Sequence, residues 1–187
     1  VMMPWADSVP AVLVSWYGGV EAGTGLADVL SGAAEPGGRL PFAIPTHADH
    51  LVDFDRDATA VTYGLLHGQW KLDADDHAAH FPFGAGQGFT TFVIGAVEPV
   101  DGGEAIGVDV TNTGTRAGST VVFAHASVAG STVERPPKRL VGFARVSAAA
   151  GATMSISIDL DWRQLDVRRD GAWWTEPGEH MIHVGFD

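Results

Sequence analysis

Three residues near the start of the chain, Trp16, Tyr17 and Glu21, have side chains suited to binding or catalysis. A carboxylate can act as a general acid or base, and an aromatic ring can stack on the ring of a ligand. Trp16 and Tyr17 follow an apolar run that predicts a strand, and ligands of open α/β sheets bind beyond the carboxyl ends of strands. These three residues are therefore the candidate substrate-binding residues.

Glu21 and Trp16 also have purely structural interpretations. Glu21 opens a predicted helix, where the macrodipole and free backbone N–H groups stabilise a carboxylate without any chemistry. Trp16 ends an apolar run, so it can pack between a sheet and a helix. The acidic residues of 49–57 are typical of a solvated loop.

Neither a metal nor a cofactor is predicted. The pairs His47/His50 and His77/His80 have i, i+3 spacing, but a transition-metal site needs three or four ligands. The glycines around residue 20 form no dinucleotide-binding or Walker pattern. The chain has no cysteine, which excludes disulfides, thiolate zinc sites and cysteine nucleophiles.

The charge balance argues against nucleic acids and membranes as partners. The chain has 11 Lys and Arg against 23 Asp and Glu, a net charge of −12, which repels phosphate backbones and anionic lipids. No apolar run approaches the roughly 20 residues of a membrane span. The first residues also lack the basic and apolar regions of a signal peptide. We expect a soluble chain and assign it no cellular location.

The first part of the chain has the pattern of an α/β layer. Residues 9–16 are almost continuously apolar, which predicts a strand buried on both faces of a parallel sheet. After a glycine turn, apolar residues recur at helical spacing over 21–30, and Gly32 follows at the position of a C-terminal cap. Such a strand and helix are typical of layered α/β folds. This part is predicted to cover residues 1–45.

The second half of the chain has a different period. Ile106, Val108 and Val110 alternate with polar or glycine residues, and turn signals separate about seven short strands in residues 91–187. This pattern predicts a β-sandwich of immunoglobulin or fibronectin type III shape. Residues 46–90, rich in Asp and His and without a period, are predicted to be a linker. The predicted fold is mainly β: a fibronectin type III-like β-sandwich preceded by the last strand and helix of an α/β domain.

A series of motifs in this order resembles glycoside hydrolase family 3. Val9-Pro-Ala-Val-Leu-Val-Ser-Trp-Tyr17 and Pro36-Gly-Gly-Arg-Leu-Pro41 are similar to the end of the family's second α/β domain. Phe81-Pro-Phe-Gly-Ala-Gly86 resembles its linker. Further motifs, similar to its fibronectin type III-like domain, lie at residues 110–114, 116–118, 136–143 and 171–178. The chain departs from the family pattern at Gly18, Ala22, Gln69-Trp70 and Gln87-Gly88-Phe89.

The resemblance implies the C-terminal part of a β-glucosidase-like enzyme that hydrolyses O-glycosyl bonds in carbohydrate metabolism. The family places its nucleophilic Asp in an N-terminal barrel and its acid/base Glu earlier in the second domain, so this chain is expected to have no catalytic residue. Its implied role is structural and stabilising, without hydrolysis on its own. Its expected partner is the upstream catalytic portion of the same enzyme or a second copy of the chain. A glycoside would bind only to the complete enzyme.

A second hypothesis is a non-catalytic β-sandwich module that binds carbohydrate or protein, with residues 1–45 as a remnant. It predicts an exposed row of aromatic side chains across one sheet face. The enzyme-segment hypothesis predicts that Trp162, Trp173 and Trp174 fill the sandwich or brace its last hairpin. It also predicts that residues 9–45 need a partner.

Overall fold

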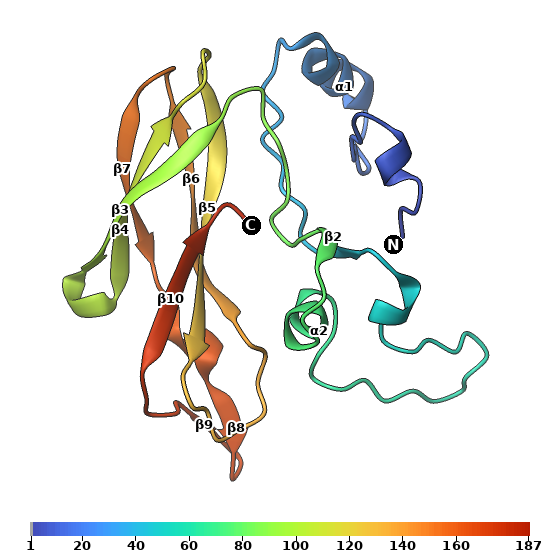
Figure 1. The fold of residues 1–187 in the computed structure, drawn as a ribbon, viewed down its shortest axis with the longest axis vertical. Coiled ribbons are helices and arrows are strands. Elements are labelled where there is room, and N and C mark those ends of the chain that lie inside the picture. The colour runs from blue at the N-terminus through green and yellow to red at the C-terminus, as the bar shows by residue number, and fades with distance from the viewer. Residues whose placement is uncertain (1) are drawn as a thin grey trace.

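A computed structural model describes residues 2–187, and its most regular part is a β-sandwich of two antiparallel sheets (Figure 1). The first sheet has the strand order β3-β4-β7, with bounds Phe92–Val100, Ala105–Asn112 and Thr153–Asp159. The second has the order β10-β5-β6, with bounds His180–Gly185, Gly118–Val128 and Arg139–Ala148. At one end, β8 (Val167–Arg169) and β9 (Ala172–Trp174) form a hairpin. The predicted fibronectin type III-like sandwich is confirmed.

The sandwich core follows from the period of two in the sequence. In β4 the side chains of Ile106, Val108 and Val110 are buried, as their alternation predicts. They pack in one cluster with Val122 of β5 and Ile158 of β7. Because each fully buried Val or Ile stabilises the fold by about 1.5 to 3 kcal/mol, this cluster holds the two sheets together.

Strand β5 is buried on both faces. Seven consecutive residues within it are buried, and its inner face, including Val122 and Ala124, contributes to the core. On its outer face, the ring centroids of Phe123 and His125 lie 5.5 and 6.1 Å from that of Phe83. The segment that joins the two halves of the chain therefore covers one face of the second sheet.

The first half of the chain contains little regular structure. Its helices are α1 (Ala22–Ser31) and α2 (Gln69–Ala74), and β1 (Ile44–Pro45) pairs with β2 (Ala79–Phe81). The described residues also contain four 3₁₀ turns: η1 (Ala6–Ser8), η2 (Ala48–His50), η3 (Asp101–Gly103) and η4 (Trp162–Leu165). The sequence predicted α1 and its cap correctly, because Gly32 ends the helix with φ of 77°, a conformation that favours glycine.

The predicted strand at residues 9–16 is not part of any sheet in residues 2–187. Its side chains are mostly exposed, including Leu13 and Val14. The physical reason is that a strand exists only through hydrogen bonds to a neighbouring strand, and the described part of the chain supplies none beside this segment. The apolar pattern is therefore present without the neighbours that it requires.

Two arginines of the sandwich hold the segment that follows α1. Arg116 donates a hydrogen bond to the carbonyl oxygen of Gly32 at 2.9 Å, and Arg145 donates one to that of Gly37, also at 2.9 Å. Between them, the Glu35 carboxylate accepts a hydrogen bond from the backbone N–H of Phe89 at 2.9 Å. The sandwich thus fixes the C-terminal end of α1, which in turn carries the turn at residues 16–21.

We expect residues 91–187 to fold without the first half of the chain, since every buried member of the core cluster lies within them. Expressed alone, this segment should unfold in one cooperative thermal transition. Its Tm should be lower than that of the sandwich in the whole chain, because removal of Phe83 uncovers Phe123 and His125. A segment without any cooperative transition in calorimetry would contradict an autonomous sandwich.

Candidate functional site

The candidate residues Trp16, Tyr17 and Glu21 lie on the turn before α1. Trp16 has a positive φ of 51° and packs edge-on against Phe42, with ring centroids 5.7 Å apart, yet 56% of it is exposed. Tyr17 is fully exposed. Glu21 occupies the N-cap position of α1, and its carboxylate makes no capping hydrogen bond. The turn therefore presents two aromatic rings and one carboxylate at the surface.

A large open hollow lies beside this turn, between residues 9–16, α1 and residues 35–40. Its volume is about 1150 Å³, and Trp16 and Glu21 are among its lining residues, whereas Tyr17 is not. Much of the lining is apolar, including Leu13, Val14 and Leu26. The structure thus brings Trp16 and Glu21 to one hollow, whose walls have the composition of a protein interior.

We call five of the exposed apolar side chains within residues 13–30 the exposed apolar strip: Leu13, Trp16, Val20, Leu26 and Leu30. Leu13, Trp16 and Leu26 also line the hollow. The exposed fractions of the five side chains range from 38% to 101%, and no residue of α1 is buried. Helices of about ten residues are marginal in water unless one face packs against another element. So many large exposed apolar side chains within residues 13–30 are unusual for a free protein surface.

In the structure, His50 contacts both His47 and His77, whereas His80 lies beside Asp7 and does not pair with His77. The rings of His50 and His77 stack with centroids 3.8 Å apart, and His47 lies edge-on to His50 at 5.2 Å. His80 instead lies 3.5 Å from the carboxylate of Asp7. Among residues 2–187, no three side chains of the metal-ligating types come close enough together to hold an ion.

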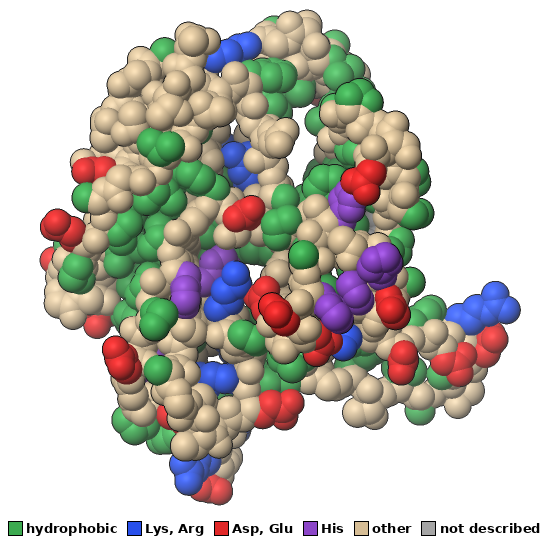
Figure 2. Space-filling model, in the orientation of Figure 1, with side chains coloured by type: hydrophobic (Ala, Val, Ile, Leu, Met, Phe, Trp, Pro, Cys, Tyr) green, Lys and Arg blue, Asp and Glu red, His purple; other side chains and the backbone are tan. Residues whose placement is uncertain are grey.

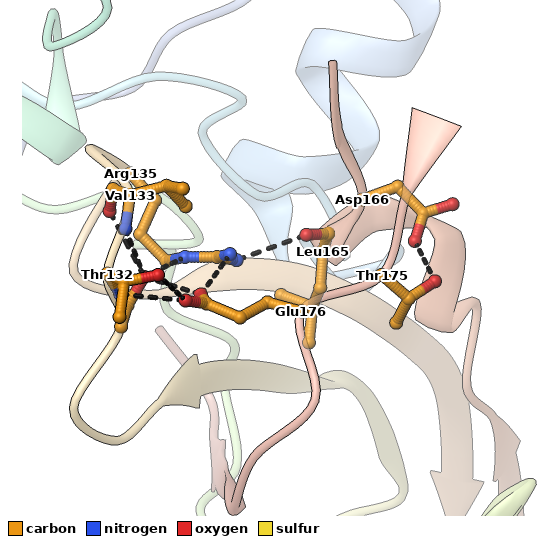
Figure 3. Close-up of polar contacts among 8 residues, drawn as sticks. Thr132, Val133, Arg135, Leu165, Asp166, Thr175 and Glu176 are labelled. Atoms are coloured by element: carbon orange, nitrogen blue, oxygen red, sulfur yellow. Dashed lines mark hydrogen bonds and ion pairs between the residues drawn. The ribbon is translucent and has the colours of Figure 1, made fainter. Parts of the chain in front are cut away.

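The carboxylate with the most perturbed pKa is Glu176, which the sequence analysis did not select (Figure 3). It accepts hydrogen bonds from the Ser131 hydroxyl at 2.6 Å and from the backbone N–H and hydroxyl of Thr132, both at 2.7 Å. Arg135 donates another at 2.7 Å. These donors, the Ser131 hydroxyl first, lower the pKa of Glu176 to about 2.

This carboxylate network is structural. Glu176 is only 5% exposed, and its carboxylate oxygens are hydrogen-bonded to residues of the same chain. Because its pKa is about 2, the carboxyl group is ionised at neutral pH and has no proton to transfer. It ties the β5–β6 loop to the segment before β10, and Arg135 also donates to the carbonyl of Leu165 at 3.0 Å. The sequence signals near Glu176 were a turn and the motif at residues 171–178, and neither assigned a role to this carboxylate.

His125 is the second titratable group that the sequence analysis missed. It is 8% exposed, and burial, assisted by the nearby Lys138 ammonium, lowers its pKa to about 4. The imidazole is therefore neutral at pH 7. It lines a second cavity, described below, on the side of the sheet that faces α2. Nothing in the local pattern of β5 distinguished His125 from its neighbours.

The tryptophans of the sandwich are bound to it by specific contacts. Trp162 packs on the core and donates its indole N–H to the carbonyl of Gly103 at 3.0 Å. Trp173 and Trp174 lie on the last hairpin under the guanidinium groups of Arg168 and Arg169, at 5.3 and 4.9 Å. The large exposed aromatics described in the sandwich region, Phe89, Phe143 and Trp173, belong to three separate segments. The module hypothesis predicts a row of exposed aromatic side chains across one sheet face, and these three residues do not form such a row.

Two family models match the chain. Residues 1–89 match the glycosyl hydrolase family 3 C-terminal domain, and residues 120–187 match the fibronectin type III-like domain. A curated relative, β-glucosidase B of Emericella nidulans, is 38% identical over 99% of this chain and 24% of its own length. The chain thus spans about a quarter of the curated relatives that it matches.

Solved structures agree over nearly the whole chain. The β-glucosidase DesR from Streptomyces venezuelae, in complex with D-glucose, superposes with a TM-score of 0.88 at 30% identity, covering 99% of this chain and 26% of that one. The β-glucosidase from Kluyveromyces marxianus superposes with a TM-score of 0.87 at 34% identity, covering 100% and 24%. No helix described in residues 2–187 is long and apolar enough to cross a membrane.

Proposed function

Because the chain belongs to glycoside hydrolase family 3, we propose that it is the structural C-terminal segment of a β-glucosidase-like enzyme. In this proposal the complete enzyme hydrolyses O-glycosyl bonds, and the segment stabilises it without supplying the catalytic nucleophile or the acid/base. Three of the curated relatives that the chain matches are β-glucosidases several times its length, and another relative is a β-xylosidase.

The exposed apolar strip carries this proposal. Residues 9–16 have the composition of a strand buried on both faces, and α1 has an apolar side with nothing packed on it in the described chain. Full burial of an exposed leucine is worth about 1.5 to 3 kcal/mol, and covering Leu13 and Leu30, which are 49% and 71% exposed, would contribute a corresponding fraction for each. We propose that the upstream catalytic portion supplies the strands beside residues 9–16 and the surface that α1 packs on.

The proposed division of labour follows the chain. Residues 1–45 complete an α/β domain, residues 46–90 link it to the sandwich, and residues 91–187 form the fibronectin type III-like domain. The link is well anchored, since β1 pairs with β2 across the intervening loop and Phe83 packs on β5. The sandwich would then brace the turn that carries Trp16, Tyr17 and Glu21 through Arg116 and Arg145.

Within the complete enzyme, we propose that the turn at residues 16–21 contacts the glycoside. Trp16 and Glu21 share one hollow, and an exposed aromatic ring beside a carboxylate is suited to stack on a sugar and to accept its hydroxyl hydrogens. Their role is binding and positioning, since the hydrolytic carboxylate pair is assigned to the upstream portion.

The test is hydrolysis of an aryl β-glucoside by the complete protein, with and without these 187 residues. The complete protein should hydrolyse the aryl β-glucoside, whereas the segment alone and the truncated protein should not. Glu21→Gln in the complete protein should raise KM and leave kcat nearly unchanged, because it removes a binding contact.

Three results would contradict the proposal. Turnover by the segment alone that disappears in Glu21→Gln would place the catalytic acid in this chain. A truncated protein as active as the complete one would show that the segment contributes nothing to the enzyme. A stable dimer of the segment in light scattering, with the strip protected from protease, would identify a second copy as the cover instead.

A further inference from the structure

A second cavity lies between α2 and the outer face of the sheet β10-β5-β6, with a volume of about 610 Å³. This volume falls within the range of about 300 to 1000 Å³ that small-molecule sites occupy. The side chains that matter here are Trp70, Asp73, His125, Lys138, Phe143 and Gln164. Figure 2 shows histidine, basic and acidic side chains gathered in the middle of the molecule, where the sandwich faces the linker segment.

His125 supplies hydrogen-bonding capacity that the protein does not use. His125 is 8% exposed and lines the cavity. Its ring neighbours are the aromatic side chains of Phe83 and Phe123. Its ring nitrogens are not among the fully buried atoms that lack a partner, so the one N–H donor and one nitrogen acceptor of the neutral imidazole are accessible to a molecule in the cavity.

Asp73 supplies the complementary acceptor. Its Oδ1 atom accepts a hydrogen bond from the Gln69 side chain at 2.8 Å, but its Oδ2 atom is buried without a hydrogen-bond partner among residues 2–187. The Lys138 ammonium lies 3.9 Å from Oδ2, which is too long for a hydrogen bond. A buried carboxylate oxygen without a donor is costly, so a ligand hydroxyl placed here would relieve that cost.

The walls and the charges of the cavity restrict the class of ligand. Phe143 is 65% exposed on β6 and offers an apolar face, while the ring of Trp70 is already packed against Arg139 at 5.3 Å. Asp73 and Asp161 balance Lys138 and Arg139 among the lining residues. A site without net charge favours a neutral ligand over a phosphate or a carboxylate.

From these contacts we infer that the cavity binds a neutral pyranose sugar. The C–H face of the ring packs against Phe143, its hydroxyl groups donate to Asp73, and His125 and Lys138 supply donors for its oxygens. An apolar platform combined with convergent donors and acceptors matches a polyhydroxylated ring. This cavity shares no lining residue with the hollow at residues 16–21, although Phe42 of its lining packs against Trp16. Sugar binding here does not depend on the proposed hydrolytic activity.

The test is direct binding to the 187-residue chain at pH 7 by nuclear magnetic resonance titration with methyl β-D-glucopyranoside and with cellobiose. Saturable shifts of amides around the cavity are expected, with a Kd on the order of millimolar. Phe143→Ala and Asp73→Asn should each weaken binding about tenfold or more. Trp173→Ala is the matched control, since Trp173 is 67% exposed on a distant hairpin, and it should leave Kd unchanged.

Unaltered amide spectra outside the cavity will establish that each variant is folded. If Asp73→Asn does not fold, Gln164→Ala, an exposed residue of the lining, replaces it and should also weaken binding. The inference is overturned if neither sugar saturates, if Phe143→Ala and Trp173→Ala have equal effects, or if glucose 6-phosphate binds more tightly than the neutral sugars. The assay involves no hydrolysis, so failure here leaves the proposed function untouched.

Discussion

Replacing Glu176 by glutamine should destabilise the sandwich more than any other single change considered for this chain. Glutamine keeps the shape of the side chain but turns one of its two acceptor atoms into an N–H donor. Depending on the orientation of the amide, either the two Thr132 donors or the Ser131 and Arg135 donors lose their acceptor, and in both cases the Arg135 guanidinium stays buried without a countercharge. Removing one partner of a buried, hydrogen-bonded pair is strongly destabilising. The apparent Tm should fall by at least roughly 5 °C.

The same carboxylate predicts how stability depends on acid. Its pKa lies at about 2 in the folded chain, against 4.5 for the ordinary group. Because the folded pKa is the lower one, the stabilisation is fully present above about pH 4.5 and is lost as pH falls towards about 2. Urea unfolding between pH 6 and pH 2.5 should therefore show a steep loss in the parent chain. In Glu176→Gln this loss should be smaller, because the group that titrates is gone.

Glu134→Gln is the matched control, since Glu134 lies in the same loop and is exposed. It should change neither the Tm nor the acid dependence. Arg135→Met should be destabilising as well, and the double variant with Glu176→Gln should be less destabilised than the sum of the two. Equal Tm values for Glu176→Gln and Glu134→Gln would show that the network contributes nothing to stability.

The second large effect is expected where the exposed apolar strip meets its proposed cover. In the complete enzyme, Leu13→Asp or Leu30→Asp would place a carboxylate in an apolar interface, which costs several kcal/mol unless it finds a partner. Association of the segment with the upstream portion, supplied as a separate polypeptide, should weaken on the order of 100-fold. Hydrolysis by the mixture should fall in parallel.

Val93→Asp provides the control for this effect, because Val93 is about as exposed as Leu13 but lies on β3 of the sandwich, away from the strip. It should leave both association and hydrolysis within a factor of about two. If Leu30→Asp assembles and hydrolyses as well as Val93→Asp, the strip is not the interface. The isolated Leu30→Asp segment should remain folded, since Leu30 is 71% exposed there.

Local sequence patterns determined those elements that form through interactions between residues a few positions apart. Alternation of Ile106, Val108 and Val110 predicted β4 and the face that it buries, because successive strand residues point to opposite sides. Helical spacing and Gly32 predicted α1 with its C-terminal cap. The ordered motifs also resembled the family to which the chain belongs. The signals for β4 and α1 are each complete within a window of about ten residues, whereas the resemblance rests on the order of motifs along the whole chain.

The polar networks and cavities were decided by tertiary structure alone. Glu176 meets Thr132 across 44 positions of the sequence, and His125 is buried where Phe83 packs on β5. No local pattern reports such contacts, since burial depends on which distant segment packs on a side chain.

Residues 9–16 also show that a local pattern cannot report tertiary contacts. Its apolar composition correctly indicates that it requires cover, and its sequence favours an extended strand. A strand, however, is made by hydrogen bonds to a neighbour, and no neighbour for it lies in residues 2–187. The composition of residues 9–16 therefore determined that this segment requires a neighbouring strand. Only the tertiary structure showed that residues 2–187 do not provide one.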